Sequence, residues 1–331
     1  MKKVLIILGG KSGEHEVSLR SAESIINNID HHQFSTSTLK INQDGSWQWA
    51  DGSHTQDLSK FKDFNIVFPI IHGTNGEDGK LQGLLEMAGV PYVGAGVLGS
   101  AICMDKVIQK QLCAQASIPQ TKYVCLHKSQ ISNLKFLISN LQFPLFVKPA
   151  NLGSSVGISK VKTSAQLQPA IDLAFQFDNK IIIEEGVEDI LEIEVAVLGN
   201  ERPETAVCGS IKPNTEFYDY QTKYITDDIV SHIPAEIPEN IANQIRKTAE
   251  EAFTLLNCSG LARIDFFYQP ASQKFYLNEV NTLPGFTSIS MYPKMWAKSG
   301  LSYQDLINKL LSLAEERHHE TSLLKTSTTT S

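Results

Sequence analysis

The chain has 331 residues, of which 42% are hydrophobic and 20% are charged, and its formal net charge is −7. This composition is that of a globular protein and excludes a disordered or fibrous class, and the length favours about two or three domains. An acidic chain lacks the basic surface that binds nucleic acid or an anionic membrane, so we expect neither partner. One small anionic ligand in a locally basic cleft stays possible.

Membrane insertion and secretion are also not expected from the sequence. The longest apolar runs, residues 4–8 and 66–71, are far shorter than the roughly 18 residues of a membrane span. The N-terminal apolar stretch is too short for a signal peptide and has no small-residue cleavage site after it. The five cysteines are odd in number and contain no Cys-x-x-Cys pair. We therefore expect no disulfide framework or zinc site, and a cytoplasmic location.

The first third of the chain alternates short apolar runs with helical patterns. Strands are predicted at residues 4–8, 66–71 and 91–93, and helices at 14–28 and 81–88. Alternation of this kind predicts a parallel, doubly wound α/β sheet.

From residue 105 onward, strands come in runs with single helices between them. Helices are predicted at 106–116, 166–177, 239–256 and 303–316, and strands at 144–149, 157–161, 180–184, 192–198, 261–268 and 274–281. This order favours α+β lobes. We expect three lobes, at residues 1–104, 105–187 and 188–318, and a disordered polar tail at 319–331.

A loop of glycine and serine is the first candidate for binding phosphate. Gly153 and Gly157 bracket Ser154 and Ser155 between two predicted strands, and Lys148 ends the strand before them. Small residues let the backbone approach an oxyanion, hydroxyls add donors, and a lysine adds positive charge. A loop of this composition is more often a surface hairpin, but the lysine favours a phosphate clamp. The earlier glycine turn at residues 9–12 lacks a glycine that the P-loop pattern requires.

Three further charged residues have two interpretations each. Lys106 starts a predicted helix and is either a second phosphate-binding cation or a solvated lysine. Glu184 and Glu185 end a buried strand and either accept from a nucleobase amine or ribose hydroxyl or mark a solvated strand end.

The strongest pattern is a hairpin between residues 261 and 281. Side chains two apart share a face of a strand, so Arg263 lies beside Asp265, and Glu279 beside Asn281. A symmetric hairpin places Asp265 opposite Glu279 and Arg263 opposite Asn281, with Cβ atoms ~5 Å apart. Paired carboxylates with an amide and no histidine or cysteine are typical of Mg²⁺ or Mn²⁺ ligands. The alternative is a solvated face on which the arginine neutralises the acids.

A turn at Pro284 and Gly285 follows this hairpin directly. The Gly285 N–H, together with Arg263, would be placed to stabilise a developing oxyanion.

These motifs, in this order, resemble the D-alanine–D-alanine ligase family of the ATP-grasp superfamily. The resemblance rests on residues 9–18, 72–79, 104–106, 148–149, 153–157, 217–224, 263–265 and 278–285. It implies a Rossmann-like parallel α/β N-terminal domain followed by the ATP-grasp fold, in which two α+β lobes clamp ATP.

The resemblance also implies a two-step reaction for peptidoglycan precursor synthesis. ATP phosphorylates a first D-alanine to an acyl phosphate, and the amine of a second D-alanine displaces the phosphate to give D-alanyl-D-alanine. Mg²⁺ or Mn²⁺, two per site, would act at the phosphates, and a homodimer is expected. A loop at residues 217–231 would close over the site and exclude water.

Site residues carry over from the family position by position. The nucleotide-binding set would be Lys106, Lys148, Ser154, Ser155, Glu184, Glu185, Val187, Glu192 and Lys223. The metal ligands would be Asp265, Glu279 and Asn281. The catalytic set would be Glu14, Ser154, Tyr224, Arg263 and Gly285, with His72, Ser290 and Met291 binding substrate.

The chain departs from the family pattern in three places. Glu185 stands where relatives often have lysine, Met291 replaces a frequent leucine, and one extra residue precedes Glu192. The insertion leaves Glu188 and Glu194 as rivals for the ribose contact.

Two alternative functions are weighed against the dipeptide ligase. A relative that makes a D-alanine–D-lactate ester generally lacks the tyrosine at the position of Tyr224. A nucleotide-binding regulatory protein that had lost the chemistry would show a damaged acid or metal set, whereas Glu14, Asp265 and Glu279 are all present.

Overall fold

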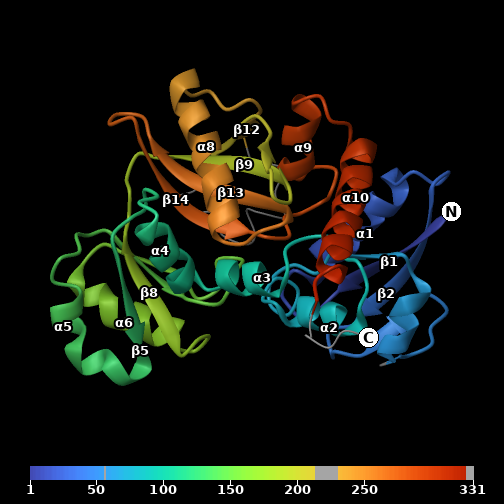
Figure 1. The fold of residues 1–331 in the computed structure, drawn as a ribbon. Helices are drawn as coiled ribbons and strands as arrows, with labels where there is room; N and C mark the ends of the chain where they lie inside the picture. Colours follow the sequence, from blue (N-terminus) through green and yellow to red (C-terminus); the bar gives the residue numbers. More distant parts are fainter. Residues whose placement is uncertain (56, 213–229, 326–331) are drawn as a thin grey trace.

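The computed structural model describes residues 1–55, 57–212 and 230–325. They form an N-terminal α/β domain, a central lobe and a C-terminal lobe (Figure 1). None of the described helices is long and apolar enough to cross a membrane.

The N-terminal domain is a four-stranded, mainly parallel sheet with helices on both faces. Its strands, in the order β3-β2-β1-β4, are β1 (Lys2–Gly9), β2 (Phe34–Ile41), β3 (Trp47–Trp49) and β4 (Ile66–Pro69). Its helices are α1 (His15–Asn28), α2 (Lys80–Ala88) and α3 (Val97–Met104), with the 3₁₀ turn η1 (Leu58–Asp63). The strand β1 pairs in parallel with β2 and β4, which confirms the predicted α/β class, while β3 is antiparallel.

The residues of β1 alternate between two cores because successive side chains point to opposite faces. Val4 and Ile6 pack in a core with α1, whereas Leu5 and Ile7 pack in a core with α2. The strand predicted at 91–93 is reduced to one parallel bridge between Val67 and Tyr92.

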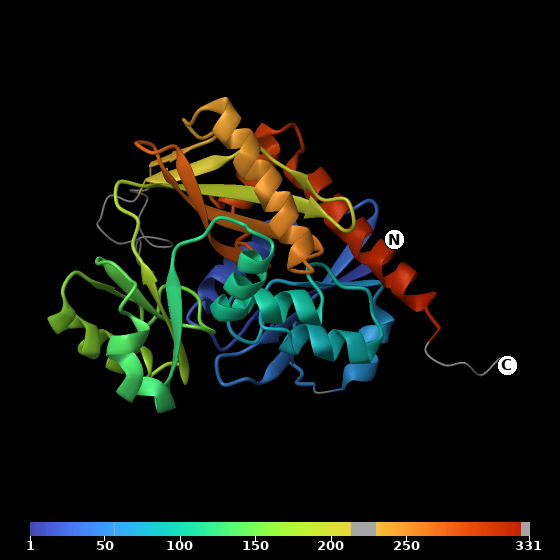
Figure 2. The same cartoon turned by 60° about the vertical axis from the view of Figure 1, so that its left-hand side comes forward.

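The central lobe is a four-stranded antiparallel sheet in the order β5-β8-β6-β7. Its elements are α4 (Lys106–Gln115), β5 (Tyr123–His127), η2 (Lys128–Asn133), α5 (Leu134–Leu137), β6 (Leu145–Pro149), β7 (Ser159–Val161), α6 (Ser164–Ala174) and β8 (Lys180–Glu185). The helix α6 covers one face, where Leu167 and Ile171 share a separate core with Val147 and Ile183. The lobe stands to one side of the rest of the molecule (Figure 2).

The C-terminal lobe is a six-stranded sheet in the order β12-β11-β9-β13-β14, with β10 also paired to β9. Its elements are β9 (Leu191–Gly199), β10 (Glu204–Thr205), β11 (Gly209–Lys212), β12 (Val230–His232), α8 (Glu239–Leu255), β13 (Gly260–Gln269), β14 (Lys274–Asn281), α9 (Met291–Lys298) and α10 (Tyr303–Ser322). One face is covered by α8, through Ile245 and Phe253 packed with Ile264 and Phe266 (Figure 1).

A single core joins the C-terminal lobe to the N-terminal sheet. Ala196 and Leu261, from β9 and β13, belong to the same cluster as Val4 and Ile6 of β1, and α9 and α10 contribute to it as well. The central lobe therefore has a core of its own, while the other two lobes share one.

The last helix is longer than predicted. It continues through Ser322, so residues 319–322 are helical, and the expectation of a disordered tail from residue 319 is wrong for these four. The Arg317 guanidinium explains the extension, because it donates to the carbonyls of Tyr92 and Gly94 and lies 4.3 Å from the centre of the Tyr92 ring. These bonds anchor the final turns of α10 to the N-terminal domain.

Candidate active site

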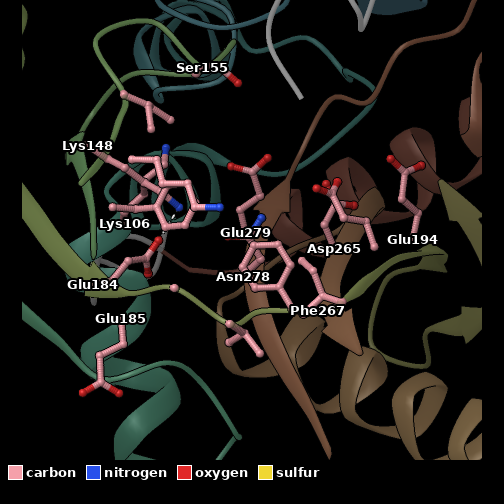
Figure 3. A pocket seen from close by; sticks show the side chains of 18 of the residues that line it. Lys106, Lys148, Ser155, Glu184, Glu185, Glu194, Asp265, Phe267, Asn278 and Glu279 are labelled. Atoms are coloured by element: carbon pink, nitrogen blue, oxygen red, sulfur yellow. Dashed lines mark ion pairs between the residues drawn. The ribbon is translucent and has the colours of Figure 1, made fainter. Parts of the chain in front are cut away.

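A cleft of about 480 Å³ lies between the central and C-terminal lobes. The central lobe contributes Lys106, Lys148, Ser154, Ser155, Glu184, Glu185 and Val187 to its walls, and the C-terminal lobe contributes Glu192, Glu194, Arg263, Asp265, Asn278 and Glu279. Lysines and the glycine–serine loop thus face carboxylates across the cleft (Figure 3). Residues predicted from two distant motifs meet here.

The hairpin of β13 and β14 has the predicted pairs at the site. Asp265 lies opposite Glu279, and Arg263 lies opposite Asn281. The hairpin is not symmetric, however, because a β-bulge follows Asp265 and Asn278 is the extra residue. The bulge turns both Asn278 and Glu279 toward the cleft.

Asp265 is the centre of a hydrogen-bonded cluster. Arg263 donates Nε to Asp265 Oδ1 at 2.8 Å and Nη2 to Oδ2 at 2.7 Å. Asn281 donates Nδ2 to the same Oδ2 at 2.9 Å. Glu194, opposite Asp265 on β9, lies 3.4 Å from Arg263 Nε. The arginine thus offsets two carboxylates, and its planar donor group holds Asp265 in one orientation.

This cluster has the donors that a hard divalent cation requires. Asn281 presents its amide nitrogen to Asp265, which leaves its carbonyl oxygen as an acceptor. Among the described residues there is no group of three His, Cys, Asp or Glu side chains that could hold a metal. The residues fit Mg²⁺ or Mn²⁺ only if the Asn281 amide serves as the third donor beside Asp265 and Glu279.

Glu184 lies at the inner wall of the cleft, between two lysines. Its Oε1 pairs with Lys148, and its Oε2 lies 3.1 Å from Lys110 Nζ and accepts from Thr121 Oγ1 at 3.0 Å. Burial alone would raise the pKa of this carboxyl, but the two lysines outweigh it and hold the pKa well below its usual range. Glu184 is therefore a buried, ionised acceptor.

The glycine–serine loop has a tight left-handed backbone. Ser154 and Ser155 have φ of 56° and 58°, and Gly157 has φ of 72°. Non-glycine residues seldom adopt this conformation, and it is found where backbone N–H groups form an anion-binding concavity. Lys106 donates Nζ to the Leu152 carbonyl at 2.8 Å, so this lysine is tied to the start of the loop.

The side chain of Glu185, unlike that of Glu184, does not point toward the cleft. Glu185 accepts from the Gln142 N–H at 3.0 Å and lies 3.7 Å from Lys122, so its side chain points away from the cleft (Figure 3). Position 185, where relatives often have lysine, therefore contributes no side chain to the cleft. At this part of the wall the cleft is lined by backbone groups and Val187. Of the three acids considered for the ribose, Glu194 is engaged with Arg263.

A smaller pocket of about 50 Å³ adjoins the cleft and holds Glu14. Lys106, Ser154 and Glu279 line both cavities, so the two cavities lie side by side. Glu14 is buried at the start of α1, and a Cβ at Gly73 would lie 2.6 Å from its Oε2. The glycine at position 73 therefore leaves room for this carboxylate.

His72 links the N-terminal domain to the loop after β14. Its Nδ1 donates to the Leu283 carbonyl at 2.9 Å, and its Nε2 lies 3.2 Å from Ser21 Oγ. Burial lowers the pKa of His72, so the ring is neutral and Nε2 accepts from the serine hydroxyl. Ser21 in turn accepts from the Phe286 N–H at 3.2 Å. This chain of bonds positions the backbone on both sides of Gly285.

Glu77 reinforces the same link and was not predicted as a site residue. Its carboxyl oxygens accept from the N–H of Gly73 at 2.8 Å and of Leu283 at 3.1 Å. Burial, and then the nearby Glu14 carboxylate, raise the pKa of Glu77 to about 8. Lys110 is the second residue that was missed. In the sequence, Glu77 lies in the glycine-rich motif at 72–79, and Lys110 lies one helical turn after Lys106. Both are weak signals that these residues belong to the site.

Gly285, Ser290 and Met291 meet where the loop runs into α9. Ser290 directly precedes the helix, and its hydroxyl lies 2.7 Å from Thr287 Oγ1. A Cβ at Gly285 would lie 2.9 Å from Ser290 Oγ, so the glycine permits this close approach. The N-terminus of a helix favours an anionic group such as a carboxylate. Lys223, Tyr224 and the motif at 217–220 lie outside the described residues.

Comparisons with known proteins agree with this geometry. The family model of the D-ala D-ala ligase C-terminus matches residues 112–312, and that of the N-terminus matches residues 3–60 and 48–95. A D-alanine–D-alanine ligase of Solibacter usitatus is 46% identical over 96% of this chain and 97% of its own length. D-alanine–D-alanine ligase A of Escherichia coli is 43% identical over 98% of both chains.

Solved structures give the same result. VanG D-Ala:D-Ser ligase from Enterococcus faecalis superposes with a TM-score of 0.86 at 36% identity, over 95% of this chain and 99% of that one. The D-alanine–D-alanine ligase from Coxiella burnetii gives a TM-score of 0.85 at 34% identity, over 97% and 96%. The fold is that of the ATP-grasp ligases, with the N-terminal α/β domain expected from the sequence. This chain belongs to the D-alanine–D-alanine ligase family.

Proposed function

We propose that this chain joins two D-alanine molecules into D-alanyl-D-alanine with ATP, through D-alanyl phosphate, for peptidoglycan precursor synthesis. The observation that supports this most directly is that the two cavities adjoin each other and share lining residues. The large cleft has the lysines and glycine–serine loop of a nucleotide site, and it shares Lys106, Ser154 and Glu279 with the small pocket at Glu14. A γ-phosphoryl group and a small amino acid would meet at that junction.

In the first step, the lysines would hold the triphosphate while the carboxylate of the first D-alanine attacks its γ-phosphorus and displaces ADP. Lys106 and Lys148 would bind phosphate oxygens, with Lys223 assigned the same role, and the Ser154–Ser155 loop would cover them. Glu184 would accept from the adenine amine, Glu185 and Val187 would offer backbone groups, and Glu192 would bind the ribose. This places the base at the inner end of the cleft and the phosphates at the junction.

Asp265, Glu279 and Asn281 would hold Mg²⁺ or Mn²⁺, two ions per site. When bound, such ions would offset the charge that develops in phosphoryl transfer. Arg263 keeps Asp265 oriented for this role through its two hydrogen bonds.

The first D-alanine would be oriented by Glu14, whose carboxylate would bind its ammonium group. Ser154 and Tyr224 would complete a hydrogen-bonded set with Glu14. The closing loop at 217–231 would exclude water, so that the acyl phosphate meets an amine instead of hydrolysing.

In the second step, the amine of the second D-alanine attacks the acyl phosphate, and inorganic phosphate leaves. Arg263 and the Gly285 N–H would stabilise the oxyanion of the tetrahedral intermediate. Ser290 and the Met291 backbone, at the start of α9, would bind the carboxylate of the second D-alanine, with His72 nearby. We further propose a homodimer in the cytoplasm and lobe boundaries at residues 104, 187 and 318.

A coupled assay of phosphate release tests this function. With ATP and Mg²⁺, release should rise with D-alanine alone, and D-alanyl-D-alanine should form in equal amount. D-lactate and D-serine, each added with D-alanine, serve as competing second substrates and should add little product. Absence of release with D-alanine, ATP and Mg²⁺ would exclude the proposal, and a dominant ester product would make the chain a D-alanine–D-lactate ligase.

A further inference from the structure

The two oxygens of Glu184 have different surroundings. Oε1 pairs with Lys148, which is 12% exposed and lines the cleft. Oε2 faces inward, where Lys110 lies at 3.1 Å and Thr121 donates at 3.0 Å. One oxygen therefore lies on the ligand side and the other on the protein side.

The ammonium group of Lys110 has contacts with three residues. Its side chain is 3% exposed on the inner face of α4, and its Nζ donates to Thr121 Oγ1 at 3.1 Å in addition to its contact with Glu184. The same Nζ lies 5.4 Å from the centre of the Tyr123 ring, within the range of a cation–π contact. Lys110 does not line the cleft, so no ligand competes for it.

Lys148 is placed to have two partners in turn. It neutralises Glu184, yet it lines the same cavity as the glycine–serine loop (Figure 3). A bound triphosphate would draw Lys148 toward its oxygens, because a phosphate carries more charge than one carboxylate. Glu184 would then be a buried carboxylate without this lysine, a costly state unless another cation remains.

We propose that Lys110 is the permanent counter-ion of Glu184, and that it lets Oε1 exchange Lys148 for the 6-amino group of the purine. Lys110 is thus a positioning residue that sets the preference of the cleft for adenine. A 6-oxo purine offers an acceptor at this position and would face an ionised carboxylate. Without Lys110, Glu184 would hold Lys148 back or take up a proton, and as a protonated acid it would donate to a 6-oxo group.

The inference rests on the proposed function, since it requires the nucleotide to lie with its base at Glu184. The experiment measures the dissociation constants of ADP and IDP, each with Mg²⁺, by calorimetry on the full chain. The native chain should bind ADP more tightly than IDP. In Lys110→Met, which keeps the length of the side chain and removes the charge, that ratio should fall roughly tenfold, the size of a hydrogen bond to a charged group.

Two more variants make the result specific. Thr121→Val keeps every charge and removes one donor to Oε2, so it should lower the ratio by about threefold. Lys122→Met is the matched control, because this exposed lysine lies beside Glu185, whose side chain points away from the cleft. Its ratio should equal that of the native chain.

The outcomes separate the inference from the function beneath it. An unchanged ratio in Lys110→Met would overturn the inference, whether the two nucleotides bind as in the native chain or are weakened equally; equal weakening would indicate a structural role only. A native chain that binds both nucleotides equally would also overturn it while leaving the ligase function intact. A native chain that binds neither and releases no phosphate would reject the proposed function itself.

Discussion

The pKa of Glu77 predicts an unusual pH dependence of stability. Its folded-state value of about 8 lies above the ordinary value of 4.5. Below pH 4.5 the side chain is protonated in both states, so it contributes no pH dependence. Between pH 4.5 and 8 the folded state keeps a proton that the unfolded state releases, and stability falls as the pH rises. Above pH 8 Glu77 is ionised in both states, and the loss in the free energy of unfolding has reached its full size.

The size of the effect follows from this window. Each pH unit between 4.5 and 8 lowers the free energy of unfolding by at most about 1.4 kcal/mol. The largest loss expected between pH 5.5 and 7.5 is therefore about 2.7 kcal/mol. Glu77 is only partly shielded from solvent, which reduces the expected loss to about 1.5 kcal/mol. Glu77→Gln removes the ionisable group and keeps the size and shape of the side chain. It also leaves one backbone N–H without its acceptor, a cost that does not depend on pH.

The assay is urea unfolding of both proteins at pH 5.5, 6.5 and 7.5, without metal or nucleotide. The free energy of unfolding of the native chain, minus that of Glu77→Gln, should decrease steadily across this range. Glu23→Gln, at an exposed position of α1, is the control and should run parallel to the native chain. A difference between the native chain and Glu77→Gln that stays constant with pH would refute the reasoning.

Three other perturbations test the site and the fold. Asp265→Asn and Glu279→Gln should each abolish phosphate release in the presence of Mg²⁺ while circular dichroism stays native, and near-normal turnover in both would contradict the metal assignment. Gly285→Ala would place a Cβ 2.9 Å from Ser290 Oγ, so the KM for D-alanine should rise at least about tenfold with little change in the KM for ATP. Arg317→Ala removes three hydrogen bonds and a ring contact, and urea unfolding should show a loss of about 3 kcal/mol; a loss under 1 kcal/mol would show that the end of α10 is not anchored.

The sequence was most informative where chemistry and periodicity coincide. The alternation along residues 261–281 was enough to place Arg263 and Asp265 on one face of their strand and Glu279 and Asn281 on one face of theirs, because side-chain direction in a strand has a period of two. The predicted pairs are present, but they arise from the β-bulge after Asp265 and not from the symmetric hairpin that was assumed. The apolar strands β1, β6, β8 and β9 were predicted within one or two residues, since buried runs between helical patterns are unambiguous. By contrast, β2 carries four Ser and Thr residues and was missed, because its stability comes from pairing with β1.

Contacts between distant residues were beyond prediction. Lys110 and Glu77 gain their roles from partners 74 and 206 residues away, Glu184 and Leu283. Neither residue has a local pattern that distinguishes it from a solvated charge, and no propensity records the burial that raises the pKa of Glu77.

The β-bulge in the hairpin has a consequence for how this protein can vary. Counting back from the pair Gln269 and Lys274 at the tip, an unbroken ladder would place Asp265 opposite Asn278 and turn Glu279 toward α8. The bulge shifts the pairing of β13 with β14 by one residue, so that the Glu279 carboxylate faces the cleft. The pair Gln269 and Lys274 closes the ladder, so the length of the exposed tip at residues 270–273 does not by itself change the pairing of Asp265 with Glu279. In this hairpin one irregular position, not the length of the turn, keeps the site in register.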